Sequence, residues 1–289
     1  MRKLTLGLVQ MSMSKGMENN LNHALDLIEI ASEKGAEVVC LPELFTTRYF
    51  AQYGAEDQEE KGLACKDTIP GKATKALAAS ARKNKISLIG GSIYESDDDQ
   101  TYNTSTVFSN KGKMLGKYRK THIPQDQYYF EKEYFEPGDT GFEVFETDQA
   151  KVASLICYDQ WYPEAARCCA LFGADIIFYP TAIGTVKGVQ QTEGNWHRAW
   201  ENVMRGHAIA NSLVVAAVNR AGNEDKMRFW GGSFVIDAFG GTLKRAGSKE
   251  EVLICEIDLD HGKEVREGWR FFRNRRPECY VKIVEPLRQ

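Results

Sequence analysis

The chain has 289 residues, of which 43% are hydrophobic and 27% are charged, and its formal net charge is -3. This composition is close to that of an average soluble protein and argues against disorder, while the near-neutral charge argues against a nucleic-acid-binding protein. No apolar run approaches the roughly 18 residues of a membrane span, and the apolar segment after Arg2 and Lys3 is too short for a signal peptide.

Seven cysteines are spread along the chain without any Cys-x-x-Cys pair. That spacing argues against a zinc ribbon and against a thioredoxin-type site. Reduced cysteines without an export signal are typical of the cytoplasm. We therefore expect a cytoplasmic protein that needs neither a metal nor a cofactor.

The first half of the chain alternates the patterns of short strands and amphipathic helices. In chain order the predicted elements are a strand at 4–9, a helix capped by Asn19 or Asn20 and ended by Gly35, a strand at 37–41, a helix at 72–84, a strand at 86–93, and a hairpin of strands at 104–109 and 114–118. The charged segment 57–66 is interpreted as a loop or a loose helix. Glu43 follows the end of one strand, and Lys120 follows the end of the hairpin.

The second half repeats this alternation. In chain order the predicted elements are a loop at 125–137, strands at 142–146 and 151–156, a helix up to Phe172, a strand ending at Pro180, a helix at 195–211, strands at 214–219, 231–236, 243–245 and 251–258, and a short helix at 260–267. Cys157 ends the strand at 151–156, before Pro163 opens a helix. The field at a helix N-terminus favours a thiolate, so Cys157 is a candidate nucleophile as well as a candidate core residue.

Two segments of the chain share one pattern. Each copy follows a predicted helix. The first copy is Gly35-Ala36-Glu37-Val38-Val39-Cys40-Leu41-Pro42, and the second is Gly173-Ala174-Asp175-Ile176-Ile177-Phe178-Tyr179-Pro180. Two such halves in a single domain over 1–289 predict an α/β fold of two sheets packed face to face with helices outside, which is a four-layer α-β-β-α sandwich. A single doubly wound sheet is the alternative, but no Gly-x-Gly-x-x-Gly loop follows a predicted strand.

Three candidate site residues each follow a predicted strand. Their motifs are Cys40-Leu41-Pro42-Glu43-Leu44-Phe45, Lys117-Tyr118-Arg119-Lys120-Thr121-His122-Ile123-Pro124 and Leu155-Ile156-Cys157-Tyr158-Asp159. In this order the three motifs resemble those of the nitrilase superfamily of carbon-nitrogen hydrolases, and the resemblance extends over essentially the whole chain.

The resemblance implies a catalytic triad. Cys157 would be the nucleophile, Glu43 the general base and Lys120 the cation that stabilises a tetrahedral oxyanion, with the backbone N–H of Tyr158 as a second donor. The chemistry needs such groups, because a thiol with its usual pKa near 8.5 is mostly protonated at neutral pH and has to be activated. Many members of the superfamily add a second glutamate, whose matching position here is Glu131, with Glu133 as its near competitor.

Four further stretches resemble the N-carbamoylputrescine amidases of this superfamily. They are 118–124, 135–142, 179–184 and 273–277. The implied reaction converts N-carbamoylputrescine and water to putrescine, ammonia and carbon dioxide. One departure concerns the acid that would hold the distal ammonium, because Val186 stands where that carboxylate is expected. Glu193 or Asp159 could take this role, and His122 is a further candidate for contact with the substrate.

The resemblance also implies a homodimer or a higher homo-oligomer, in which the segment from about 268 makes subunit contacts. The arginines of 270–276 could instead form a nucleic-acid patch, although ion pairs at a subunit contact fit better. Other substrates of the same superfamily stay open, among them N-carbamoyl-β-alanine, an aliphatic amide and a nitrile, as does the release of ammonia from glutamine for a partner enzyme. Outside this class, the alternatives are a non-catalytic interaction protein and a thiol redox protein that pairs Cys157 with Cys168 or Cys169.

Overall fold

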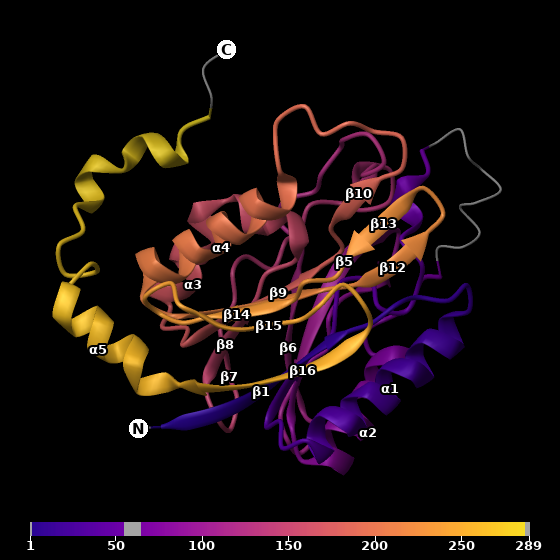
Figure 1. Ribbon diagram of the computed structural model, residues 1–289, viewed down its shortest axis with the longest axis horizontal. Coiled ribbons are helices and arrows are strands. Elements are labelled where there is room, and N and C mark those ends of the chain that lie inside the picture. Colours follow the sequence, from indigo (N-terminus) through magenta and orange to yellow (C-terminus); the bar gives the residue numbers. More distant parts are fainter. Residues whose placement is uncertain (1, 55–64, 287–289) are drawn as a thin grey trace.

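The structure is a computed structural model that describes residues 2–54 and 65–286 (Figure 1). Most of the charged segment predicted as a loop or a loose helix, 57–66, lies outside the described residues. No described helix has the length and apolar character needed to cross a membrane.

The first sheet is built mainly from the first half of the chain. Its strand order is β16-β1-β2-β3-β5-β4, and β6 also pairs with β5. Its strands are β1 (Lys3–Gln10), β2 (Val38–Cys40), β3 (Ser87–Ile89), β4 (Ile93–Asp97), β5 (Gln100–Phe108), β6 (Met114–Arg119) and β16 (Glu251–Asp258). β1, β2 and β3 are parallel, so their carboxyl ends lie at one edge. β16 comes from the end of the second half of the chain and pairs antiparallel with β1.

The second sheet has the order β15-β14-β11-β9-β8-β7, with β8, β9 and β11 parallel. Its strands are β7 (Phe145–Glu146), β8 (Lys151–Ser154), β9 (Ile176–Thr181), β11 (Val214–Asn219), β14 (Phe234–Ile236) and β15 (Thr242–Arg245). β2 and β9 come from the two segments with one repeated pattern, and each lies within a parallel trio.

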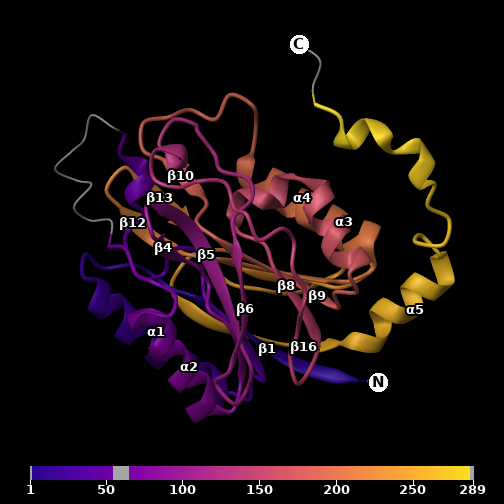
Figure 2. The same cartoon turned by 180° about the vertical axis from the view of Figure 1, so that it is seen from behind.

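Helices cover the outer face of each sheet. α1 (Met17–Glu33) and α2 (Lys72–Asn84) lie on the first sheet, whereas α3 (Pro163–Leu171) and α4 (Trp196–Asn211) lie on the second (Figures 1 and 2). One apolar cluster joins the facing sides of the two sheets, through residues such as Leu6, Leu8 and Phe178. Two further clusters fill the spaces between each sheet and its helices. The predicted four-layer α-β-β-α sandwich is therefore confirmed.

The C-terminal segment follows α5 (Leu259–Trp269) and runs along one side of the molecule in two short 3-10 helices, Pro277–Cys279 and Val281–Val284 (Figure 2). Its apolar side chains are largely exposed, with Val284 84% accessible. Its role in subunit contacts stays a prediction.

The predicted strand at 86–93 is two strands, β3 and β4, separated by a turn at Gly90 and Gly91. Gly91 has a φ of +60°, and a Cβ there would come within 2.2 Å of the carbonyl oxygen of Pro42. The turn lets the Ser92 hydroxyl accept a hydrogen bond from the N–H of Leu44 at 2.9 Å. This break in the strand therefore supports the segment that carries Glu43.

The predicted cap of the first helix was wrong, because α1 begins one turn earlier with Gly16 as its N-cap. Asn20 instead ties two loops together from inside the helix. Its Oδ1 accepts from the N–H of Ser14 at 2.7 Å, and its Nδ2 donates to the carbonyl oxygen of Thr46 at 3.0 Å.

Sequence patterns missed a third, three-stranded sheet. It consists of β10 (Gly184–Val186), β13 (Met227–Trp230) and β12 (Ala221–Glu224). Its strands have only three or four residues, too few to show a period. Val186 lies on β10, so this small sheet contributes to the site described next.

Candidate active site

Glu43 lies just beyond β2, on a backbone segment that a buried arginine holds in place. The Nη2 of Arg220 donates to the carbonyl oxygens of Glu43, Leu44 and Thr47 at 3.0, 2.8 and 3.0 Å. Its Nη1 donates to both carboxylate oxygens of Glu224 at 3.0 Å. Arg220 and Glu224 are 0% and 1% exposed, so this ion pair is inside the protein. It braces the turn at Leu44, whose φ is +48°.

Lys120 follows β6 and joins two carboxylates. Its Nζ donates to Glu43 Oε1 at 2.8 Å and to Glu131 Oε2 at 2.6 Å. All three side chains are buried, at no more than 1% exposed. Burial disfavours the ammonium form, but Glu131 and Glu43 outweigh burial and raise the pKa of Lys120 above its usual value. Lys120 is therefore a permanent cation in this site.

Two neutral side chains also donate hydrogen bonds to the carboxylates. Asn103 Nδ2 donates to Glu43 Oε1 at 2.8 Å, and the Tyr49 hydroxyl donates to Glu131 Oε1 at 2.8 Å. Burial raises the pKa of Glu131, although Lys120 opposes the shift. Within the described part of the chain, Glu43 Oε2 has no hydrogen-bond partner. One carboxylate oxygen of Glu43 is therefore free to take up a proton.

Cys157 occupies the strand-to-helix connection after β8. It begins a 3-10 helix, Cys157–Trp161, ahead of α3, and has a φ of +41°. Such a left-handed conformation is costly for a non-glycine residue and has to be held by the surroundings. Asp159 Oδ2 accepts from the N–H of Ile156 at 2.9 Å and from the Tyr118 hydroxyl at 2.8 Å, and these bonds hold the turn.

The charges of the buried cluster act on the thiol. Burial and the charge of Glu43 raise the pKa of Cys157 well above its usual value, and Lys120 opposes them only in part. The direction is opposite to the one that the helix-end field predicts. The Cys157 thiol is thus protonated at neutral pH, and the Glu43 carboxylate, which is predicted to be the base, lies within electrostatic reach of it.

A pH titration should show this protonated thiol. Thiolates absorb near 240 nm, and the difference in absorbance between the wild type and Cys157→Ala reports the ionisation of Cys157 alone. Because the pKa of Cys157 is raised, we expect no rise in this difference through the ordinary thiol range around pH 8.5, and a rise only at higher pH. A midpoint below about pH 8 would contradict a base-activated thiol.

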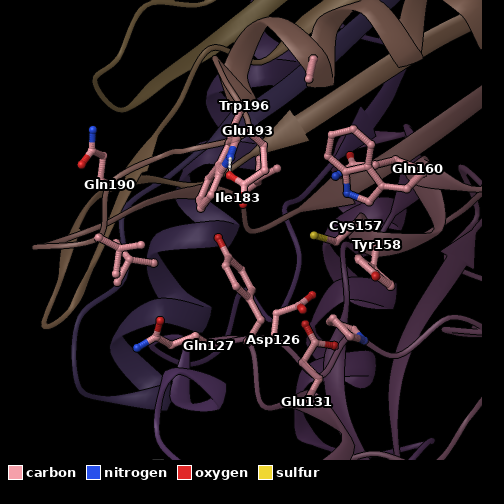
Figure 3. Close-up of a pocket in the computed structure, with 16 residues that line it drawn as sticks. Asp126, Gln127, Glu131, Cys157, Tyr158, Gln160, Ile183, Gln190, Glu193 and Trp196 are labelled. Carbon is pink, nitrogen blue, oxygen red and sulfur yellow. Dashed lines mark hydrogen bonds between the residues drawn. The ribbon is translucent and has the colours of Figure 1, made fainter.

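Cys157 opens onto a cavity of about 460 Å³. Figure 3 shows its sulfur pointing into the cavity, with Glu131 on one side and Glu193 and Trp196 on the opposite side. Ile183 and Val186 supply apolar wall. The cavity is large enough for a small linear molecule that reaches from the sulfur towards Glu193.

The structure brings together Glu43, Lys120, Glu131 and Cys157, which are far apart in sequence. Of the two competing glutamates, it is Glu131 that contacts Lys120, whereas Glu133 is exposed. These positions are those that a sulfur nucleophile with a proton acceptor and an oxyanion-binding cation requires.

The residues predicted to contact the substrate divide into two groups. Tyr158 and Glu193 line the cavity. Asp159 and His122 do not: Asp159 is 0% exposed, and its Oδ1 lies 2.7 Å from His122 Nδ1. The suggestion that Asp159 could hold a substrate ammonium was wrong, because its carboxylate is occupied in holding the Cys157 turn. His122 stacks on the ring of Tyr162 at a centroid distance of 3.6 Å, outside the cavity.

Sequence reasoning missed several residues of the site, namely Tyr49, Asn103, Gln160, Arg220 and Glu224. Each of these side chains is buried: Gln160 directly follows the third motif and Tyr49 lies four residues after the first, whereas the other three lie outside all three motifs. Single polar residues in otherwise ordinary segments carry no spacing signal, so only the fold could find them. All seven cysteines are free, and Cys157 forms no disulfide with Cys168 or Cys169.

Comparisons with known proteins agree with this geometry. The carbon-nitrogen hydrolase family matches residues 5–267. An N-carbamoylputrescine amidase of Solanum lycopersicum is 38% identical over 98% of this chain and 95% of its own length. A citrullinase of Francisella tularensis is 37% identical over 98% of this chain and 99% of its own length. The crystal structure of a carbon-nitrogen hydrolase from Helicobacter pylori G27 superposes with a TM-score of 0.91, at 36% identity, over 99% of this chain and 100% of that one.

Proposed function

The chain belongs to the carbon-nitrogen hydrolase family, and from this premise we propose that it hydrolyses N-carbamoylputrescine through a thioester on Cys157. The observation that carries the substrate choice is the acidic, cation-free lining of the cavity next to the sulfur. The buried Lys120 cluster supports an enzyme over a non-catalytic interaction protein, because desolvating three charged groups beside a thiol destabilises a fold that makes no use of them.

In the first half of the proposed reaction, the sulfur of Cys157 attacks the ureido carbonyl carbon while Glu43 Oε2 takes the thiol proton. The carbonyl π pair moves to oxygen, and the resulting oxyanion is stabilised by Lys120 and by the backbone N–H of Tyr158. The tetrahedral intermediate collapses as a C–N bond breaks, and Glu43 returns the proton to the leaving nitrogen. Glu131 holds Lys120 in position through its 2.6 Å contact.

In the second half, a water molecule replaces the leaving group. Glu43 takes a proton from this water as its oxygen attacks the thioester carbon, and the same two donors stabilise the second oxyanion. The C–S bond then breaks, Glu43 returns the proton to the sulfur, and a carbamic acid leaves. The carbamic acid loses carbon dioxide as its remaining C–N bond breaks, and its hydroxyl proton passes to the nitrogen. The balance is one N-carbamoylputrescine and one water giving putrescine, ammonia and carbon dioxide.

The charge of the cavity supports a cationic substrate. Three carboxylates, those of Asp126, Glu131 and Glu193, line it, and no lysine, arginine or histidine is found among the described lining residues. Lys120 already neutralises Glu131, which leaves Asp126 and Glu193 to attract a positive charge. The carboxylate of N-carbamoyl-β-alanine would meet repulsion instead, and citrulline carries such a carboxylate beside its ammonium.

The walls also fit the four methylene groups of N-carbamoylputrescine. Ile183 and Val186 are apolar and buried, and the position at which an acid was expected is thus part of the apolar wall. Glu193 is held by Trp196, whose Nε1 donates to Glu193 Oε2 at 3.1 Å. A hydrogen bond from its own backbone and this bond from Trp196 lower the pKa of Glu193, so its carboxylate is charged at neutral pH. We therefore assign the distal ammonium to Glu193.

A substrate panel tests the proposal. The purified protein should release ammonia from N-carbamoylputrescine with a higher kcat/KM than from citrulline, N-carbamoyl-β-alanine or butyramide. A preference for either carboxylate-bearing compound would reject the substrate assignment and leave the reaction class intact. Failure to hydrolyse any amide, ureido compound or nitrile would reject the proposed chemistry.

Replacing Glu193 by glutamine should weaken the binding of a cationic substrate only. Because Glu193 is exposed and exposed ion pairs are weak, we expect KM for N-carbamoylputrescine to rise only about 5-fold, with kcat unchanged. Butyramide, which has no charge, is the control substrate and should be unaffected. Glu164→Gln, on the surface helix α3, is the control variant, and an equal rise in KM there would refute a specific contact.

A further inference from the structure

Gln160 has a buried amide group with one unused donor. Its side chain is 0% exposed, and among the described residues its Nε2 has no hydrogen-bond partner. Gln160 nevertheless lines the cavity of Cys157. A buried donor without a partner destabilises the fold, so its presence at a binding cavity calls for a reason.

The orientation of this amide is fixed by its neighbour. The Trp200 Nε1 donates to Gln160 Oε1 at 2.7 Å, and an indole N–H can only donate. The end of the amide that faces Trp200 must therefore be the oxygen, and Nε2 is the end left over. His207 Nε2 lies 2.8 Å from the carbonyl oxygen of Gln160, so the backbone is held as well.

The local helix places this donor beside the nucleophile. Cys157 and Gln160 are three residues apart in one 3-10 helix, where side chains at positions i and i+3 eclipse each other. Both residues line the same cavity, and Figure 3 shows them on the same side of it. Gln160 therefore lies on the wall of the cavity next to the region in which the carbonyl group under attack has to lie.

We propose that Gln160 Nε2 donates a hydrogen bond to the carbonyl oxygen of the bound substrate and to the oxyanion that follows. This inference rests on the proposed function and adds a side-chain donor to those of Lys120 and Tyr158. N-Carbamoylputrescine offers a single acceptor, its ureido oxygen, because its nitrogens carry only donors. A spare N–H in this cavity can therefore pair with one atom of that substrate.

Two variants remove the donor in different ways. Gln160→Glu keeps the oxygen that accepts from Trp200 and replaces Nε2 by an acceptor, whereas Gln160→Met is neutral and removes the amide. Because loss of one oxyanion donor typically costs a factor of about 10²–10³, we expect kcat/KM to fall at least about 100-fold in both, mainly through kcat. Trp200→Phe is the matched control, since it removes the anchor and retains Nε2, and we expect it to lose less than about 10-fold.

Alkylation of Cys157 distinguishes the loss of a hydrogen bond to a carbonyl oxygen from a general disturbance of the nucleophile. Iodoacetamide carries an amide oxygen and 2-bromoethylamine carries none, and mass spectrometry of the Cys157 peptide gives both rates. Gln160→Met should slow alkylation by iodoacetamide relative to 2-bromoethylamine. Equal slowing by both reagents would show a purely structural role and overturn the proposal.

The kinetic results distinguish this proposal from the proposed function. If the wild type hydrolyses none of the panel, the proposed function fails, and the ratio of the two alkylation rates still tests the Gln160 donor. If the wild type is active and Gln160→Met matches it, the donor proposal alone fails. If kcat/KM falls only in Gln160→Glu, the added charge is the cause. If it falls as much in Trp200→Phe as in Gln160→Met, disturbed packing is the cause. Either result overturns the donor proposal.

Discussion

Replacing Cys157 by serine should reduce hydrolysis by about 10⁴-fold or more while the protein stays folded. Loss of the nucleophile from an enzyme with a covalent intermediate has effects of this size or larger. A hydroxyl is a much weaker acid than a thiol, so Glu43, suited to take a proton from sulfur, is a poor base for serine. The change is small in volume and lies at the wall of a cavity, so the native packing should survive.

The measurement is kcat/KM for the best substrate of the panel, together with urea unfolding of both proteins. Cys168→Ser is the matched control, because Cys168 lies on α3 outside the cavity, and it should keep wild-type activity. This control also addresses the redox alternative, which would need a second cysteine. An active Cys157→Ser variant would exclude the thioester mechanism, and an inactive Cys168→Ser variant would revive the redox idea.

Replacing Lys120 by methionine should cost both activity and stability. Glu43 and Glu131 would be left as two buried carboxylates with no cation between them. Removing one partner of a buried ion pair typically destabilises a protein by about 3–5 kcal/mol, and losing an oxyanion donor costs a further factor of about 10²–10³ in turnover. No other variant discussed here should lower the free energy of unfolding as much.

The stability loss should depend on pH in a defined direction. Burial raises the pKa of Glu131 even in the wild type, and Lys120 opposes this shift; without Lys120 the pKa rises further, so this carboxyl favours its protonated form in the folded state. The stabilising contribution of Glu131 is then present at low pH and is lost as the pH rises through the raised pKa. The difference in unfolding free energy between the wild type and Lys120→Met should accordingly be larger at pH 8 than at pH 5.

Urea unfolding at both pH values checks this expectation. The exposed Lys132, adjacent to Glu131 in sequence, gives the control variant Lys132→Met, which should change stability by less than about 0.5 kcal/mol at either pH. If Lys120→Met is as stable as the wild type, the charge of Lys120 does not stabilise the two buried carboxylates.

The origin of each site residue explains how far sequence patterns could lead. Glu43 and Cys157 follow β2 and β8, which belong to the parallel strands of two mixed sheets, and functional residues gather where parallel strands end. Their placement could therefore be predicted from apolar runs and from motif order. The break at Gly91 could not be predicted, because a glycine between two apolar segments looks the same whether the strand continues or turns.

Asp159 and Gln160 show what sequence patterns could not predict. Their neighbours Cys157 and Tyr158 were predicted from the motif, yet the motif does not tell which acid holds the turn and which amide faces the cavity. That assignment depends on Tyr118 and Trp200, which arrive from distant elements and use up particular hydrogen-bonding atoms.

The sequence by itself determined the alternation of strands and helices and the two similar halves, and its motifs predicted three side chains that the structure brings together. These features are local or periodic, so they can be recognised in the linear sequence. Only the tertiary structure decided that Glu131 rather than Glu133 contacts Lys120, that Asp159 braces the turn at Cys157, and that Gln160 retains a free donor. The physical reason is that burial and hydrogen-bond satisfaction depend on which atoms meet across the packed sheets.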